Sequence, residues 1–302
     1  LYYELTKKIK SIKMKPILKL SLLALFFSIS LLARSIDDIK ASGEIVIAVY
    51  EDFPPYSFME DGVPKGIDIE LGKKVANSLN VKPIWYFTGS DENLADDLRN
   101  TIWRGNLVHK TKADVMFRIP YDYDYLRMTN ESTGELENEM VTIKGPYQSE
   151  KWIIATNKEI IPQIKTLAIF AYQTIGVEVD TLPDLHLSGF ARGLIQKNVK
   201  HYTKFQEAIN DFKNGKIDAI AGLKSQIEYL IDYKNNKDKY YLTQDIPQMK
   251  SQWDLATAVS SNYRDLSYHI DGLIDTAYKN NEIKEIFENF GVEYIAPISK
   301  TQ

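Results

Sequence analysis

The sequence contains no cysteine. Disulfide bonds, thiolate metal sites, cysteine nucleophiles and a lipid-modified N-terminal cysteine are therefore all excluded. Histidine is also scarce: His109, His186, His201 and His269 are scattered, and no two of them have the spacing of metal ligands. We therefore expect neither a metal ion nor another cofactor.

Long apolar runs are confined to the N-terminal region. Met14 opens a short basic stretch, an apolar run of 13 residues follows at 20–32, and a small-x-small triplet, Ala-Arg-Ser, comes next. This pattern predicts a secretory signal peptide, because the run is shorter than the roughly 20 residues that span a membrane. The alternative is an uncleaved N-terminal anchor. With cleavage, a mature chain that begins near Ile36 is expected to be soluble, and a Gram-negative periplasm fits it best. Residues 1–35, some of which precede the plausible start at Met14, are therefore set aside from the fold.

Positive charge is in short supply once this segment is removed. Residues 1–35 hold seven of the 37 basic residues and one of the 41 acidic residues, so the rest of the chain has a formal charge of −10. Such an acidic surface argues against nucleic acid or an anionic membrane as a partner. The remaining 267 residues suit one large domain or two lobes of ordinary size.

From residue 44 onward, short β-rich runs alternate with helical stretches. The run 44–50 is apolar on both faces, as in a buried strand, and 66–79 has apolar residues at four-residue intervals, as on one face of a helix. This alternation predicts an α/β fold with βαβ units, mostly parallel sheets and helices on both faces. A Gly-Pro-Tyr break is expected at 145–147, and a flexible acidic insertion at 130–138. The other expected strands are 83–87, 114–118, 152–156, 174–179, 199–202, 217–223 and 253–260, and the other expected helices are 91–108, 185–195, 205–214, 224–233, 266–279 and 283–290.

Candidate ligand-binding residues follow from the strand ends. In open α/β sheets, ligands bind beyond the carboxyl ends of strands, near the N-termini of helices. This rule selects the loops that follow the expected strands 44–50, 114–118, 174–179 and 217–223. The candidate residues are Glu51, Asp52, Tyr56, Arg118, Tyr121, Asp180, Thr181 and Lys224.

Two of these candidates have a structural alternative within the core. Arg118 ends an expected buried strand, where a guanidinium group is stable only beside a carboxylate. Its partner is either an acid group of a ligand or an internal acid, Asp122 or Glu51. Tyr56 either offers its ring to a ligand or is a core aromatic behind the loop.

Helix capping is the alternative for three acidic or hydroxyl residues. Asp68 lies at the start of the expected helix 66–79, and capping of that helix is its favoured role. Asp180 and Thr181 precede the next helix, so that pair either binds a ligand or caps the helix, with capping favoured.

Three motifs in order resemble the family 3 extracellular solute-binding proteins. The first is Asp-Phe-Pro-Pro-Tyr-Ser-Phe at 52–58 with Asp-Gly at 61–62 and Gly-Ile-Asp-Ile-Glu-Leu at 66–71. The second is Gly-Lys-Ile-Asp-Ala-Ile at 215–220, and the third is the helical segment 280–291. The resemblance implies a periplasmic-binding-protein-like fold and capture of a small molecule for an ABC-type importer. The implied partners are the ligand and the membrane permease, and no enzymatic activity is implied.

The same resemblance implies a lobe organisation. It predicts a discontinuous first lobe of residues 43–147 plus 252–295 and an inserted second lobe of residues 148–251. The two crossings, near 145–149 and 247–252, would form a hinge that absorbs backbone rotation when the lobes close.

Departures from the family pattern bear on the ligand. Amino-acid binders of this family carry an Arg in the turn after the fifth strand, but the corresponding turn here, 119–123, has none. They also carry an Asp where this chain has Leu223. Without both charges the paired recognition of a zwitterion is lost, so an ordinary α-amino acid is not the expected ligand.

Two other functions are compatible with the fold. The segments 114–124, 145–149 and 193–199 resemble binding-protein-like partners of quinoprotein methanol dehydrogenases, which implies an accessory protein of a periplasmic quinoprotein dehydrogenase. Periplasmic dehydratases of prephenate-like acids share the fold as well. That activity needs a cleft carboxyl with a raised pKa, for which Glu51 or Glu178 is available, but no convincing catalytic constellation is visible.

Overall fold

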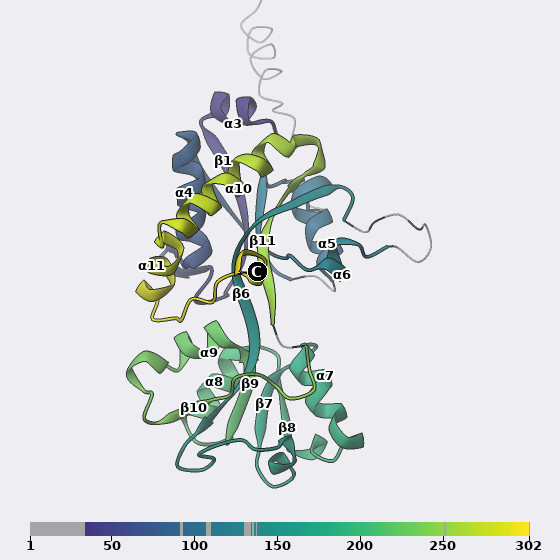
Figure 1. Ribbon diagram of the computed structural model, residues 1–302, viewed down its shortest axis with the longest axis vertical. Coiled ribbons are helices and arrows are strands. Elements are labelled where there is room, and N and C mark those ends of the chain that lie inside the picture. Colours follow the sequence, from purple (N-terminus) through teal and green to yellow (C-terminus); the bar gives the residue numbers. More distant parts are fainter. Residues whose placement is uncertain are drawn as a thin grey trace, which may run out of the picture. The chain divides into compact units, whose positions relative to one another are not determined.

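The computed structural model describes residues 34–90, 93–106, 110–129, 134, 136, 138–250 and 252–301, which belong to one compact unit, Ala33–Gln302 (Figure 1). The predicted signal peptide, apart from Arg34 and Ser35, lies outside the described residues. His109 and most of the predicted insertion 130–138 lie outside them as well.

The strands form one long path with three regions of different pairing. β4, β1 and β5 are parallel, β5, β11, β6 and β9 are antiparallel neighbours, and β9, β7 and β8 are parallel again. A separate hairpin joins β2 and β3. The bounds are β1 Glu44–Tyr50, β2 Phe58–Glu60, β3 Val63–Lys65, β4 Lys82–Thr88, β5 Val115–Pro120, β6 Val141–Asn157, β7 Ile175–Glu178, β8 Val199–Tyr202, β9 Ala219–Leu223, β10 Tyr240–Leu242 and β11 Gln252–Ser260.

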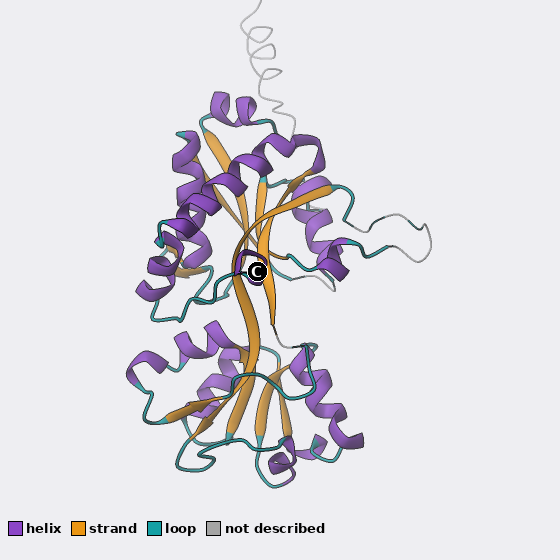
Figure 2. Cartoon of the chain, in the orientation of Figure 1, coloured by secondary structure: helices purple, strands orange, loops and turns teal. Residues whose placement is uncertain are grey.

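Helices flank the strands of both halves of this path (Figure 2). Their starts have local causes: Ser35 and Asp38 form a capping box for α3, and Thr181 caps α7, as the capping alternative predicted. The α-helices are α3 Ile36–Ser42, α4 Ile67–Leu79, α5 Leu94–Leu98, α6 Tyr123–Leu126, α7 Leu182–Gly189, α8 Phe205–Lys213, α9 Lys224–Leu230, α10 Arg264–Lys279, α11 Glu282–Asn289 and α12 Ile298–Thr301.

The buried apolar side chains form separate cores. Two clusters draw their fully buried members only from residues up to 147 and from 255 onward. Two others draw theirs only from residues 153–246. Since each set has its own strands and helices, the fold consists of two α/β lobes, as the sequence predicted.

Strand β6 is shared by both lobes. It pairs with β11 through Lys151 and with β9 from Trp152 onward (Figure 1). The break expected at 145–147 is therefore wrong. Gly145 has a φ of 68° and lies beside a register shift in the β6–β11 pairing, so the glycine forms a bulge within a continuous strand.

The long helix expected at 91–108 is also wrong in its extent. The described residues hold only the short helix α5 and one π-helical turn, Arg99–Trp103. The turn ends at Gly105, whose φ is 81° and whose missing Cβ would lie 2.7 Å from the carbonyl oxygen of Lys110. The chain therefore reverses where a helix would have continued.

Candidate functional site

The loop after β1 is bound to the start of α4 by its backbone. The amide N–H groups of Ile67 and Asp68 donate to the carbonyl oxygens of Pro55 and Tyr56, at 2.9 and 3.0 Å. Gly66 permits this approach: its φ is 133°, and a Cβ there would lie 2.0 Å from the Tyr56 oxygen. The first helical N–H groups are thus satisfied by the loop, which holds Tyr56 in place.

The side chain of Arg118 lies over two aromatic rings of that loop. Its guanidinium carbon is 3.5 Å from the ring centroid of Tyr56 and 5.1 Å from that of Phe53. The two rings are stacked with their centroids 5.6 Å apart. Tyr56 is fully buried and Arg118 is 7% exposed, so these cation–π contacts are largely desolvated and correspondingly strong.

The internal partner of Arg118 is Glu150 of β6. An Arg118 Nη2–Glu150 Oε2 distance of 3.9 Å pairs the charges, and the Tyr56 hydroxyl donates to the same carboxylate oxygen. The expected internal partners were wrong: Asp122 instead caps α6 and pairs with Lys250, and Glu51 lies exposed.

Gln148 completes this side of the site. Its Nε2 donates to the Tyr56 hydroxyl at 3.0 Å, so that hydroxyl both accepts and donates. Gln148 and Glu150 are both fully buried, and alternate residues of a strand project from the same face. Burial and the nearby charge of Glu150 raise the pKa of Tyr56, which therefore stays protonated.

Asp68 does not cap α4, contrary to the capping expectation. The N-cap residue is Gly66, and the fully buried Asp68 carboxylate accepts a hydrogen bond from the Tyr147 hydroxyl at 3.1 Å. Because the loop carbonyls already satisfy the helix start, the carboxylate is directed into the interior. Burial raises its pKa to about 7, although Arg118 and the Tyr147 hydroxyl act in the opposite direction.

We call these residues the Arg118 cluster: Phe53, Tyr56, Asp68, Arg118, Tyr147, Gln148 and Glu150. Three of its side-chain atoms are buried without a hydrogen-bond partner in the protein: Asp68 Oδ2, Arg118 Nη1 and Gln148 Oε1. Buried polar atoms without partners are rare in folded proteins, and each one calls for a ligand, a water or a strain explanation.

The backbone at Arg118 is unusual as well. Its φ is 68°, and β5 contains an extra residue here, since Ala256 pairs with Ile119 while Ala258 pairs with Met116. Bulges of this kind favour glycine, and a long side chain in this conformation costs about 1–3 kcal/mol. The contacts of the guanidinium group offset that strain.

Lys224 is held by acidic side chains. Its Nζ lies 2.5 Å from Glu228 Oε1 and 2.8 Å from Glu293 Oε2, and its side chain is 9% exposed. Glu228 Oε2 also accepts the backbone N–H of Glu293 at 2.9 Å. Burial raises the pKa of Glu228, whereas the Lys224 hydrogen bond lowers that of Glu293. Lys224 thus ties α9 to the segment that follows α11.

No described hydrogen bond or ion pair joins the side chains of the remaining candidates to the Arg118 cluster. The Thr181 hydroxyl caps α7, and the Asp180 backbone N–H donates to Asp184 at 3.1 Å. Asp52 is exposed, with Lys204 Nζ at 3.9 Å. The backbone N–H of Tyr121 donates to the Asp254 carbonyl at 2.8 Å. Of the predicted residues, the structure therefore brings together Tyr56 and Arg118.

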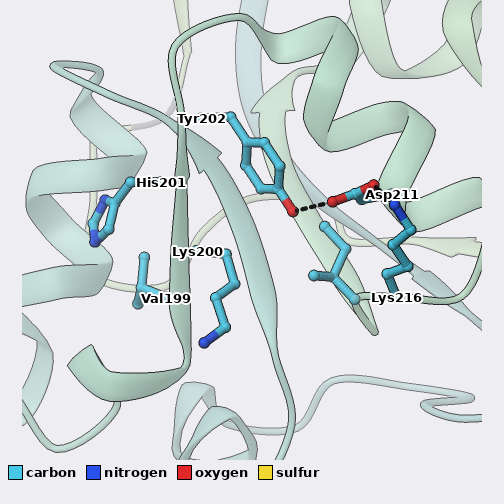
Figure 3. A pocket seen from close by; sticks show the side chains of 7 residues that line it. Val199, Lys200, His201, Tyr202, Asp211 and Lys216 are labelled. Atoms are coloured by element: carbon cyan, nitrogen blue, oxygen red, sulfur yellow. Dashed lines mark hydrogen bonds and ion pairs between the residues drawn. The ribbon is translucent and has the colours of Figure 1, made fainter.

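A cavity of about 500 Å³ lies elsewhere, beside the edge strand β8 (Figure 3). Three of its polar side chains are paired with one another: Tyr202 donates to Asp211 at 3.0 Å, and Lys216 lies 2.8 Å from the same carboxylate. It contains none of the predicted ligand-binding residues; its lining is Val199, Lys200, His201, Tyr202, Asp211, Lys216 and Ile217.

No group of three or more His, Asp or Glu side chains among the described residues has the arrangement of a metal site. None of the helices in the described ranges is both long and apolar enough to cross a membrane.

Comparisons with known proteins agree with this architecture. The family model of bacterial extracellular solute-binding proteins, family 3, matches residues 45–129, and no curated protein sequence matches the chain. Among solved structures, an ancestral cationic amino acid solute-binding protein matches with a TM-score of 0.65 and 17% identity, over 85% of this chain and 99% of its own. An amino acid ABC transporter substrate-binding protein from Streptococcus pneumoniae, bound to L-arginine, matches with a TM-score of 0.61 and 21% identity, over 85% and 98%. The solute receptor for L-cysteine of Neisseria gonorrhoeae matches with a TM-score of 0.55 and 20% identity, over 85% and 93%.

The resemblance to family 3 of the bacterial extracellular solute-binding proteins is thus confirmed over residues 45–129, which contain the first of the three motifs, and the described chain has the two-lobed α/β fold of such proteins.

Proposed function

We propose that this chain is a periplasmic solute-binding protein that captures a small molecule for an ABC-type importer and is not an enzyme. The observation that carries the proposal is the Arg118 cluster. It joins the loop after β1 and the end of β5 to Glu150 on β6, the strand that continues into the second lobe. A solute that contacts this cluster would sense both lobes, and differential contacts of that kind are what drive lobe closure.

The lobe boundaries belong to the same proposal. The first lobe would consist of residues 43–147 plus 252–295 and the second of residues 148–251, with hinge crossings near 145–149 and 247–252. The separate buried clusters support this division. The bulge at Gly145 supports the first crossing, because a glycine with positive φ tolerates backbone rotation.

We propose that the ligand-facing residues are those selected from the strand ends other than the helix cap Thr181: Glu51, Asp52, Tyr56, Arg118, Tyr121, Asp180 and Lys224. We propose that the solute is not an ordinary α-amino acid, since the turn 119–123 lacks an Arg and Leu223 stands where the family's amino-acid binders have an acid. Lys224 could engage a solute only by leaving Glu228 or Glu293.

The test is direct identification of the solute. The unit Ala33–Gln302 is exported to the periplasm of a host, purified without refolding, and examined by native mass spectrometry and by mass spectrometry of the released small molecules. The result expected is one co-purifying compound that raises Tm when added back to solute-free protein. No bound compound, together with no Tm shift across a panel of carboxylates, alcohols and aromatics, would overturn the proposal.

The same protein also tests the alternatives. If only a quinoprotein dehydrogenase raises the Tm of the purified chain, the protein is an accessory protein of that enzyme and not a transport protein. Consumption of a prephenate-like acid by the purified chain would establish an enzyme.

A further inference from the structure

The Arg118 cluster has the composition of a cation-binding cage, and the cation in it belongs to the chain itself. Two stacked aromatic rings, Tyr56 and Phe53, lie under the guanidinium group of Arg118. The Glu150 carboxylate is 3.9 Å from it, and Asp68 acts on it electrostatically. Aromatic faces together with buried carboxylates are the groups that bind guanidinium and ammonium ligands.

The backbone at Arg118 is strained, which points to a role for its side chain. Arg118 occupies the left-handed position of a bulge, with a φ of 68°, where glycine is the favoured residue. A backbone outlier of this kind supports a hypothesis of function for its side chain. Arg192 has a similar φ of 62° but is exposed, so it provides a matched comparison.

One donor of the guanidinium group has no protein partner. Arg118 Nη1 is buried and makes no hydrogen bond, whereas Nη2 faces Glu150. A cation placed beside Arg118 would meet a like charge, while a carboxylate would meet an unused donor. The cage is therefore closed to cations, while Arg118 Nη1 is open to an acceptor, and Asp68 Oδ2 and Gln148 Oε1 are open to a neutral donor.

We infer that Arg118 is a specificity-determining residue: it fills the cation subsite of the cluster from within, so the protein excludes guanidinium- and ammonium-bearing solutes and selects a neutral or carboxylate-bearing one. The second half of this inference, the selection of a neutral or carboxylate-bearing solute, rests on the proposed function. The first half, that the cage is a cation site already occupied, is a property of the chain alone.

The first half is tested by emptying the cage. The variant Arg118→Gly keeps the backbone conformation and removes the side chain, and the probe is n-propylguanidinium, with the uncharged n-propylurea as its isosteric control. We expect Arg118→Gly to bind n-propylguanidinium about tenfold or more tightly than the wild type does, by calorimetry and by Tm shift. The control variant Arg192→Gly should show no gain, and adding Glu150→Gln to Arg118→Gly should weaken the new binding.

Three outcomes would overturn the inference: no gain in Arg118→Gly, an equal gain for n-propylurea, or an equal gain in Arg192→Gly. If Arg118→Gly does not fold, Arg118→Asn replaces it, because asparagine also tolerates a left-handed backbone. The second half is decided by the solute recovered from the wild type. If that solute is a guanidinium or ammonium compound, the inference is contradicted, while the proposed binding function is supported. Failure to recover any solute counts against the binding function, and the n-propylguanidinium result still decides whether Arg118 fills a cation subsite.

Discussion

Replacing Asp68 by Asn should remove a pH dependence that the buried carboxylate imposes on stability. In the folded protein the pKa of Asp68 is about 7, because burial disfavours its charged form, whereas an exposed aspartate has a pKa of about 3.8. The folded state therefore holds this proton more tightly than the unfolded state does. The stability from this group is fully present below about pH 4 and is lost as the pH rises through about 7. The full difference amounts to about 4 kcal/mol in the free energy of unfolding.

The assay is urea unfolding of the wild type and of Asp68→Asn at a series of pH values from 4 to 8. We expect the wild-type free energy of unfolding to fall relative to that of Asp68→Asn as the pH rises, by up to about 4 kcal/mol. The matched control is Asp61→Asn, which alters an exposed carboxylate near the same loop and should leave the pH profile unchanged. A difference that is flat, or that rises with pH, would show that Arg118 stabilises an ionised Asp68 and would refute the reasoning.

Substitutions at Gly66 and Lys224, each with a matched comparison variant, test two further contacts by urea unfolding. Gly66→Ala should lose about 3 kcal/mol or more, since its Cβ would collide with the Tyr56 carbonyl and its φ of 133° suits only glycine. Gly62→Ala, which has a φ of 76° but open space around it, should lose only about 1 kcal/mol. Lys224→Met should lose about 3–5 kcal/mol by leaving Glu228 buried and unpaired, and the double variant Lys224→Met/Glu228→Leu should recover most of that loss. Failure of the double variant to recover would show that an unpaired charge on Glu228 is not the cause of the loss.

Local pattern was sufficient for much of the fold. The strands predicted at 44–50 and 199–202 have those bounds in the structure; the first is rich in residues of high β-propensity, and the second begins and ends with such residues, Val199 and Tyr202. The helix predicted at 66–79 begins one residue later, at Ile67, and ends where predicted. The break predicted at 145–147 was wrong. A glycine in the sequence is equally compatible with a turn and with a bulge inside a strand, and only the structure shows that Gly145 forms a bulge.

The candidate site was predicted in part. Sequence reasoning selected Arg118 and Tyr56 but did not identify Glu150 as the partner of either side chain. Glu150 lies 32 positions beyond Arg118 and belongs to no motif. No sequence signal marked this pair, because Gln148 and Glu150 lie in a polar stretch with Ser149 and Lys151, and only the structure shows that both are fully buried on one face of β6. Asp68 was assigned to capping because nothing local shows that the carbonyl groups of Pro55 and Tyr56 already satisfy the helix start.

By itself, the amino-acid order determined the alternation of strands and helices, the absence of thiol chemistry, and which loops hold charged and aromatic side chains. These follow from periodicity and composition, which act over a few residues. Tertiary structure alone decided which acid meets Arg118, that Lys224 is held between Glu228 and Glu293, and that Asp68 is directed inward. The physical reason is that burial and pairing of charges depend on segments far apart in the chain, and those are brought together only by the sheet.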